Sequence, residues 1–139
     1  MIEIEVEKPV IAFRLNSTSG LSTYLQLAQQ VRQALRLGEL HPGDQLPTVK
    51  EVVGALAINP NTVLKAYRLL EYEGLVQGRP GQGTFVIRSL QGPPSAKQSV
   101  LRRSLERWVR EGLESGFDAD ALEAMFSASM RMVQEERIA

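Results

Sequence analysis

Residues 59–68 place hydrogen-bonding side chains at the start of one predicted helix. Asn59 and Pro60 predict that start, because asparagine caps helix N-termini and proline at the first helical position lacks an N–H that would have no partner there. The polar or basic positions are Asn59, Asn61, Thr62, Lys65 and Arg68. Asparagine can bond adenine bidentately in the major groove, whereas threonine, lysine and helix N–H groups bind phosphates. Together these residues could read duplex DNA.

Taken singly, each of these residues has a simpler interpretation, which we favour for any one of them. Asn59 would only cap the helix, while Lys65 and Arg68 would form a solvated face. For the group as a whole the DNA interpretation is favoured, because the surrounding elements are those that a DNA-binding helix requires.

A shorter helix is predicted immediately before, over residues 48–56. Thr48 and Glu51 have the spacing of a capping box, in which the hydroxyl accepts from the N–H of Glu51 and the carboxylate accepts from the N–H of Thr48. Residues 57–59 then join it to the second helix, Pro60 to about Glu73, as in a helix-turn-helix. The predicted buried positions are Val49, Val52, Val53 and Leu56 in the first helix, and Val63, Ala66, Tyr67, Leu69 and Leu70 in the second.

A β-hairpin is predicted after Gly74, which fits a left-handed helix C-cap. The β-prone runs 75–77 and 84–87 flank a turn over residues 78–83 that is rich in glycine and proline. A small hairpin with a basic, glycine-rich tip suits the minor groove, because arginine favours its negative potential. The candidate contacts are Arg79, Gly81, Gln82 and Gly83. An ordinary hairpin is the alternative, but the position directly after a candidate recognition helix disfavours it.

These stretches resemble the DNA-binding domain of the GntR family of bacterial transcription regulators over roughly residues 20–88. The resemblance is carried by Leu-Pro-Thr at 46–48, Asn-Thr-Val at 61–63, Leu-Glu-Tyr-Glu-Gly-Leu-Val at 70–76 and Gly-Gln-Gly-Thr-Phe-Val at 81–86. Residues 58–63 and the short C-terminal tail resemble the YtrA subfamily in particular. Such proteins often control neighbouring ABC-transporter operons.

The resemblance also implies roles for individual residues. Lys50 stands where the family usually has arginine, and Thr48 precedes it at the start of the same helix. Asn59, Asn61 and Thr62 match the polar positions at the start of the recognition helix, and Gly81 matches the wing-tip glycine. Pro60 and Leu64 stand where many members place base-reading arginines, so Lys65 and Arg68 are expected to supply part of that charge.

Composition excludes several other classes of function. The 139 residues leave room for one domain and a small appendage, and the absence of cysteine removes thiolate chemistry. The single histidine, His41, lies in a polar loop, so we predict no metal site and no cofactor. No paired carboxylates, nucleophile elbow or phosphate loop can be recognised, which predicts that the protein is not an enzyme. No membrane span or signal peptide is recognisable, which predicts no membrane partner and a cytoplasmic location.

The net charge is zero, which by itself disfavours nucleic-acid binding. The distribution is less even, because residues 20–90 hold seven basic and five acidic side chains. This small excess predicts modest non-specific affinity and a dependence on dimerisation for tight binding.

The N-terminal part is predicted as residues 1–19, with strands at residues 2–6 and around Ile11, Phe13 and Leu15. An amphipathic helix should follow from Leu21 to Leu37, ended by Gly38. Its apolar stripe is Leu21, Leu25, Ala28, Val31 and Leu35. Near its start, the Tyr24 hydroxyl could meet a phosphate, although packing against the core is favoured. Residues 40–46 are predicted as a loop.

Residues 89–97 read as a linker, and residues 98–139 as two antiparallel helices broken at Gly116, the second capped by Asp118. Such a hairpin cannot bury its own apolar face, so the same hairpin of a second copy is the expected partner. The predicted dimer interface is Leu101, Leu105, Trp108, Leu122, Phe126, Met130 and Val133. Met125, Met130 and Met132 also allow a ligand pocket, but a dimer core is favoured.

The predicted fold class is thus mainly α with a small β-hairpin: a winged helix-turn-helix domain, residues 20–88, followed by a two-helix dimerisation hairpin. The favoured function is a homodimeric, sequence-specific DNA-binding regulator, most simply a repressor, acting on double-stranded DNA at a pseudo-palindromic operator. The alternative is a protein-interaction module that uses the winged helix as a scaffold. An unidentified small-molecule effector is left open, whereas the roughly 50 residues after the wing are too few for a large effector-binding domain.

Overall fold

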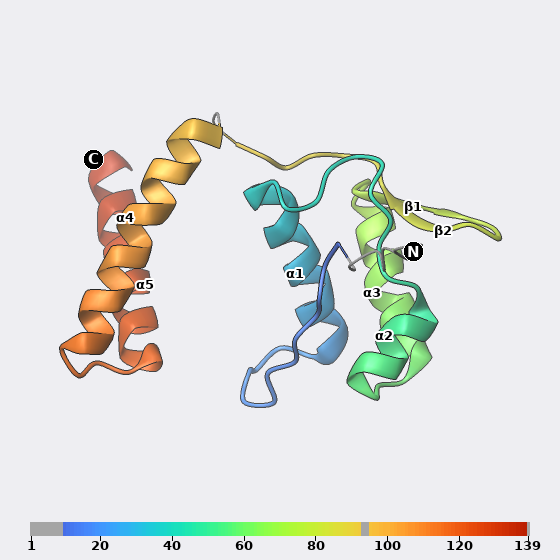
Figure 1. Ribbon diagram of the computed structural model, residues 1–139, viewed down its shortest axis with the longest axis horizontal. Helices are drawn as coiled ribbons and strands as arrows, with labels where there is room; N and C mark the ends of the chain where they lie inside the picture. Colours follow the sequence, from blue (N-terminus) through green and yellow to red (C-terminus); the bar gives the residue numbers. More distant parts are fainter. Residues whose placement is uncertain (1–9, 93–94, 139) are drawn as a thin grey trace, which may run out of the picture. The chain divides into compact units, whose positions relative to one another are not determined.

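The computed structural model describes residues 10–92 and 95–138, in two compact units, Met1–Gly92 and Pro93–Ala139. The first unit contains α1 (Thr23–Leu37), α2 (Val49–Leu56), α3 (Pro60–Tyr72) and the strands β1 (Val76–Arg79) and β2 (Gly83–Val86) (Figure 1). The second contains α4 (Ser95–Glu114) and α5 (Ala119–Ile138). This is the predicted fold class, mainly α with one small hairpin. The strand predicted at residues 2–6 lies outside the described residues.

The core of the first unit lies where α1, α2 and α3 meet the base of the hairpin. Its fully buried side chains include Leu27, Val31 and Leu35 from α1, with Val63 and Leu70 from α3. This agrees with the predicted stripes except at two positions of the first one. Leu25 is only partly buried, and the neighbouring Leu27, which was not predicted, is fully buried instead. The helix begins at Thr23 rather than Leu21, so Leu21 lies in the preceding turn, where helical periodicity does not apply, and 43% of it is exposed.

Local capping signals set the helix boundaries as predicted. Gly38 and Gly74 adopt left-handed φ angles of 72° and 76° at the ends of α1 and α3. The Thr48 hydroxyl accepts from the N–H of Glu51 at 3.1 Å, and the Asn59 carboxamide oxygen accepts from the N–H of Asn61 at 2.8 Å. One detail differs: the Glu51 carboxylate accepts from the Thr48 hydroxyl, at 3.1 Å, instead of from its backbone N–H.

The wing is a two-stranded antiparallel hairpin to which the predicted loop 40–46 adds a third backbone. Val76 pairs with Val86 and Arg79 with Gly83, so the strands reach further into the predicted turn than the sequence suggested. On the other side of β2, the N–H of Val86 donates to the carbonyl of Asp44 at 2.8 Å, and Gln45 forms an isolated bridge with Phe85. The strand β2 is therefore held along both edges.

The predicted strand around Ile11, Phe13 and Leu15 is wrong. Ile11 and Phe13 are partly buried against the core, whereas Leu15 is exposed. The backbone here bonds side-chain amides of α1 in place of a neighbouring strand. The N–H of Arg14 donates to the Gln30 carboxamide oxygen at 2.8 Å, and the Gln30 amide donates back to the Arg14 carbonyl at 2.6 Å.

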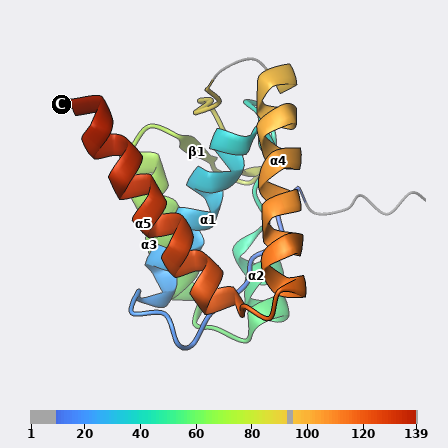
Figure 2. The same cartoon turned by 90° about the vertical axis from the view of Figure 1, so that its left-hand side faces the viewer.

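The C-terminal unit is a helical hairpin that buries little of its own apolar surface. Its first helix begins at Ser95, inside the segment predicted as a linker. Gly116, with φ 96°, lies in the turn, and the Asp118 carboxylate accepts from the N–H of Ala121 at 2.8 Å. The helices diverge from this turn (Figure 2). Leu122 packs against Gly112 and is buried inside the hairpin, unlike the rest of the predicted dimer face.

Within the described residues, none of the helices has the length and apolarity that crossing a bilayer requires.

A bidentate ion pair joins α1 to the end of α3. The Arg32 Nε donates to Glu73 Oε2 at 2.9 Å, and the second contact joins a terminal guanidinium nitrogen to Oε1 at 2.5 Å. The hydrogen bond from Arg32 lowers the pKa of Glu73, and the same bond raises the pKa of Arg32. The pair holds the helix that carries the candidate DNA-reading residues against α1.

We expect Glu73→Gln to lower the free energy of unfolding by about 1 kcal/mol near neutral pH. Because folding lowers the pKa of Glu73, its contribution is present above the unfolded value, about 4.3, and is lost as the pH falls through the folded value. Arg32 stays protonated throughout. The free energies of unfolding of wild type and variant, measured in urea, should thus converge as the pH falls through the lowered folded-state pKa of Glu73. Glu39→Gln, at an exposed site after α1, is the control, and a difference that persists at low pH would contradict the assignment.

Candidate nucleic-acid interface

The polar stripe of α3 lies opposite its buried face. Asn61, Lys65 and Arg68 are exposed at spacings of four and three residues, which place them on one side of a helix. Val63, Ala66, Tyr67 and Leu70 are buried on the other side. Asn59 is exposed and uses its carboxamide oxygen as the cap, and Thr62 is partly buried. Asn59 therefore caps the helix, as predicted, and its amide group is the part left for another partner.

Lys65 stands over an aromatic ring. Its Nζ lies 4.0 Å from the ring centroid of Tyr24, a partly buried residue of α1 that packs against the core. A cation over an aromatic face is attracted by the ring quadrupole, so the ammonium is held at a fixed place at the edge of α3. The favoured packing role of Tyr24 is confirmed, and supporting Lys65 is a second role that the sequence did not indicate.

The start of α2 is tied to α3 through a buried tyrosine. The Tyr67 hydroxyl donates to the Pro47 carbonyl at 2.6 Å, and burial raises the pKa of Tyr67, which keeps the hydroxyl protonated as a donor. Thr48 and Lys50, both exposed, follow directly at the start of α2. Their positions relative to the polar stripe of α3 are thereby fixed.

The tip of the wing is a tight turn that presents one arginine. The N–H of Gln82 donates to the Arg79 carbonyl at 3.0 Å, with Pro80 second and Gly81 third at φ 74°, the pattern of a type II turn. Arg79 is exposed, and its guanidinium carbon lies 4.6 Å from the centroid of the Phe85 ring. Gly81 and Gln82 are exposed, and Gly83 is partly buried.

An open groove of about 620 Å³ brings the wing and the start of α2 together. It is lined by Thr48, by Glu71 of α3 and by wing residues that include Arg79, Gly81, Gln82 and Gly83. All four predicted wing contacts, together with Thr48 at the N-cap of α2, therefore line one groove. Asn61, Lys65 and Arg68 form the separate stripe on α3. Lys50 is exposed at the beginning of α2.

Two residues that position the wing were missed from the sequence. Gln45 donates its amide to the Gln82 carbonyl at 3.1 Å, and a Cβ at Gly83 would overlap that amide. Glu71 of α3 accepts from the N–H of Gly78 at 3.0 Å. Both are ordinary surface residue types, and the only sequence signal for Gln45 is the glycine that makes room for it.

A family model described as "Bacterial regulatory proteins, gntR family" matches residues 23–86, which span α1 to the end of β2. An HTH-type transcriptional regulator of Bacillus subtilis, YhcF, is 36% identical over 104 residues, covering 75% of this chain and 86% of YhcF. The chain belongs to the gntR family. It is a helix-turn-helix transcriptional regulator, as predicted.

Two further relatives of this GntR protein confirm the resemblance to YtrA. The HTH-type transcriptional repressor YtrA of Bacillus subtilis is 29% identical over 110 residues, covering 78% of this chain and 85% of YtrA. The solved structure of YtrA from Sulfolobus acidocaldarius, a GntR-family transcription factor, matches at 27% identity with a TM-score of 0.50. That match covers 88% of this chain and 99% of the solved chain.

We expect Gln45→Ala to loosen the wing without unfolding the domain. The loss of one exposed hydrogen bond should cost about 0.5–1.5 kcal/mol locally, which raises the exchange rate of the amides of residues 82–85 by roughly two- to tenfold. Amide hydrogen exchange measured by NMR tests this. Gln77→Ala, which removes an exposed glutamine of β1, is the matched control, and equal exchange in both variants would show that Gln45 does not hold the wing.

Proposed function

We propose that this GntR protein represses transcription by binding a pseudo-palindromic operator as a homodimer in the cytoplasm. The observation that carries the proposal is the geometry of α3, whose polar stripe is exposed opposite a completely buried face, next to a wing with a basic tip. A recognition helix presents such a stripe to base edges in the major groove. The likeness to a protein named as a transcriptional repressor supports the sign of regulation. We accordingly propose a binding role and not a catalytic one.

Individual side chains have distinct roles in this proposal. Asn61 reads a base, because its side chain is exposed at the start of α3 and a carboxamide can bond adenine bidentately. Lys65 and Arg68 contact phosphates further along the helix, and Thr62 and the remaining amide of Asn59 do so at its start. These contacts set the register of the helix on the duplex.

The wing and the start of α2 supply further contacts. Arg79 enters the minor groove, and the exposed backbone at Gly81 to Gly83 lets the sugar-phosphate chain approach closely. Thr48 and Lys50 bind a phosphate or a base edge from the first helix of the motif. The groove lined by Thr48 and the wing is open enough for the backbone of one DNA strand to pass through it.

The C-terminal hairpin is the proposed dimer interface. Leu101, Leu105, Phe126, Met130 and Val133 are all exposed, by 43–59%, and Trp108 is only partly buried. Large exposed apolar side chains at helical spacing on both helices mark an interaction site. Leu122 is buried between the two helices of the hairpin. We therefore propose that it packs beneath this surface and does not contact the second copy directly. A second copy of the hairpin would complete a four-helix arrangement.

Dimerisation would also compensate for the low DNA affinity that the small net charge of one DNA-binding domain implies. Residues 20–90 carry an excess of only two positive charges, so one domain would release few counterions on binding. Two linked domains engage two half-sites, and the second binding event becomes intramolecular. We therefore expect tight binding only to a two-fold symmetric site.

Selection of bound sequences from a random duplex pool at near-physiological salt tests the proposal. We expect a two-fold symmetric consensus, with half-sites about one helical turn apart. Against this site, Asn61→Ala should cost about 1–3 kcal/mol at one base position, whereas Lys65→Ala should weaken specific and random DNA alike. Equal losses on both kinds of DNA for Asn61→Ala would rule it out as a base reader, and recovery of no consensus would contradict the proposal.

For the dimer, we expect Met130→Glu to raise the dissociation constant at least about tenfold, because a charge would replace an apolar side chain in the interface. Sedimentation velocity over a concentration series measures the change. Arg131→Glu is the matched control, since it introduces the same side chain at the next, exposed position. A mass unaffected by Met130→Glu would show that this helix face is not the interface.

A further inference from the structure

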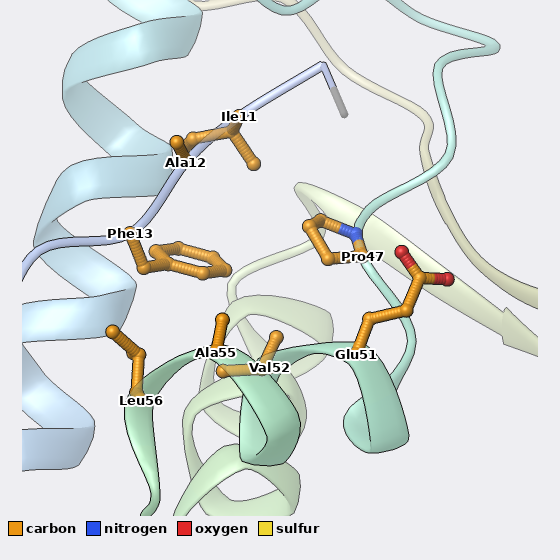
Figure 3. Close-up of a pocket in the computed structure, with 8 residues that line it drawn as sticks. All are labelled: Ile11, Ala12, Phe13, Pro47, Glu51, Val52, Ala55 and Leu56. Atoms are coloured by element: carbon orange, nitrogen blue, oxygen red, sulfur yellow. The ribbon is translucent and has the colours of Figure 1, made fainter. Parts of the chain in front are cut away.

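An apolar pocket of about 220 Å³ lies between the N-terminal segment and α2 (Figure 3). Ile11 and Phe13 form one wall, and Val52 and Leu56 of α2 form the opposite one. Figure 3 shows the Phe13 ring reaching over α2, with the Glu51 carboxylate beside Pro47 at the edge of the same space. None of the residues assigned above to DNA or to the dimer lines this pocket.

The size of the pocket limits what it can hold. A protein cavity of about 150 Å³ with apolar walls stays dry and binds benzene. A pocket of about 220 Å³ therefore accommodates one six-membered ring with a short substituent. Its walls offer such a ring a partly buried phenyl side chain and branched aliphatic groups, which favour an apolar ligand.

Among the described residues that line the pocket, Glu51 alone is ionisable, so their charge is negative. One carboxylate oxygen of Glu51 accepts from the Thr48 hydroxyl, and among the described residues no basic side chain forms an ion pair with Glu51. The carboxylate is exposed, so a ligand's positive group can reach it while the rest of the ligand fills the apolar walls.

We propose that this pocket binds a compact apolar molecule with one positive charge, such as an arylalkyl ammonium ion, and that its occupancy strengthens operator binding. The second half of this proposal rests on the function proposed above. The ring would lie between Phe13 and Val52, with the ammonium group against the Glu51 carboxylate.

The coupling to DNA runs through the capping box. The Glu51 carboxylate now shares the Thr48 hydroxyl proton, and Thr48 also lines the groove beside the wing. An ammonium ion at Glu51 competes for that carboxylate, which releases the hydroxyl to donate to a phosphate. The ligand also cancels a negative charge close to Lys50. Both changes favour a polyanion, so the ligand acts as a co-repressor.

Binding is tested first on the full chain without DNA, with benzylammonium, benzyl alcohol and benzoate as probes. Methyl NMR signals of Ala12, Val52 and Ala55 report on the pocket. We expect saturable shifts with benzylammonium, about two- to fivefold weaker binding of the alcohol, and still weaker binding of benzoate. Glu51→Gln should remove the preference for the cation, and because glutamine also serves in a capping box, the helix start is kept. Glu39→Gln is the control for loss of a carboxylate elsewhere.

A second variant tests the location. Ala55→Leu adds volume at the pocket and should abolish the shifts for all three probes. No saturable shift with benzylammonium in the wild type, as expected if another part of the chain or a second copy fills the pocket, would overturn the proposal. Equal affinity for benzylammonium and benzoate would overturn the role of Glu51.

The effect of the ligand on operator affinity is measured by fluorescence anisotropy on the selected operator, with and without benzylammonium. We expect about a two- to fivefold gain in affinity with ligand. Glu51→Gln without ligand should give only the part of this gain that comes from removing the charge beside Lys50, because the glutamine oxygen still accepts from the Thr48 hydroxyl. Ligand binding with unchanged operator affinity would overturn the co-repressor role. Operator binding without any ligand binding would defeat this inference alone. Ligand binding without any operator binding would defeat the proposed function, and with it the co-repressor role, but not the ligand site.

Discussion

The burial of one face of α3 is the constraint on which the rest of the structure depends. Val63, Ala66 and Leu70 have no exposed surface, and the Tyr67 hydroxyl is bonded to the Pro47 carbonyl. Successive residues of a helix are about 100° apart, so turning α3 by one position would bury Lys65 or a neighbouring polar group without a partner. The rotation of α3 about its axis is therefore fixed by apolar contacts, and the polar stripe points outward as a consequence.

Two of the few positive charges of the domain are also held in place by the folded framework. Lys65 stands over Tyr24, and Arg79 stands over Phe85, so both cations are supported by rings that belong to the folded framework. A side chain that is already ordered loses less conformational entropy when it meets its partner. A domain with a small net charge can in this way concentrate its electrostatic attraction at the helix edge and the wing tip instead of spreading it over the surface.

The helix ends could be predicted from the sequence, because a capping residue and the backbone groups that it bonds lie within three or four residues of each other in the chain. Thr48, Asn59, Gly74 and Asp118 all act as their residue types indicated. The exposure of Asn61, Lys65 and Arg68 on one side of α3 likewise follows from their spacing in the sequence. The residues that support the site could not be predicted in this way, since Gln45 bonds the wing across 37 residues and Tyr24 meets Lys65 from another helix. The alternation of Ile11 and Phe13 wrongly predicted a strand. Periodicity indicates which side chains are buried, but it does not indicate which groups form hydrogen bonds with the backbone.

That last difference has a consequence for how the domain can respond to a ligand. The wall of the pocket that contains Ile11 and Phe13 is held by the amides of Gln26 and Gln30, not by a sheet. Side-chain amides have rotatable bonds, so this wall can adjust to a ligand at lower cost than a paired strand. The opposite wall, α2, is fixed to α3 through the Tyr67–Pro47 bond. A ligand in the pocket would thus move the wall that contains Ile11 and Phe13 and leave α2 and α3 in place. In the proposed regulation, the charge of Glu51, rather than a displacement of helices, is therefore the means of coupling.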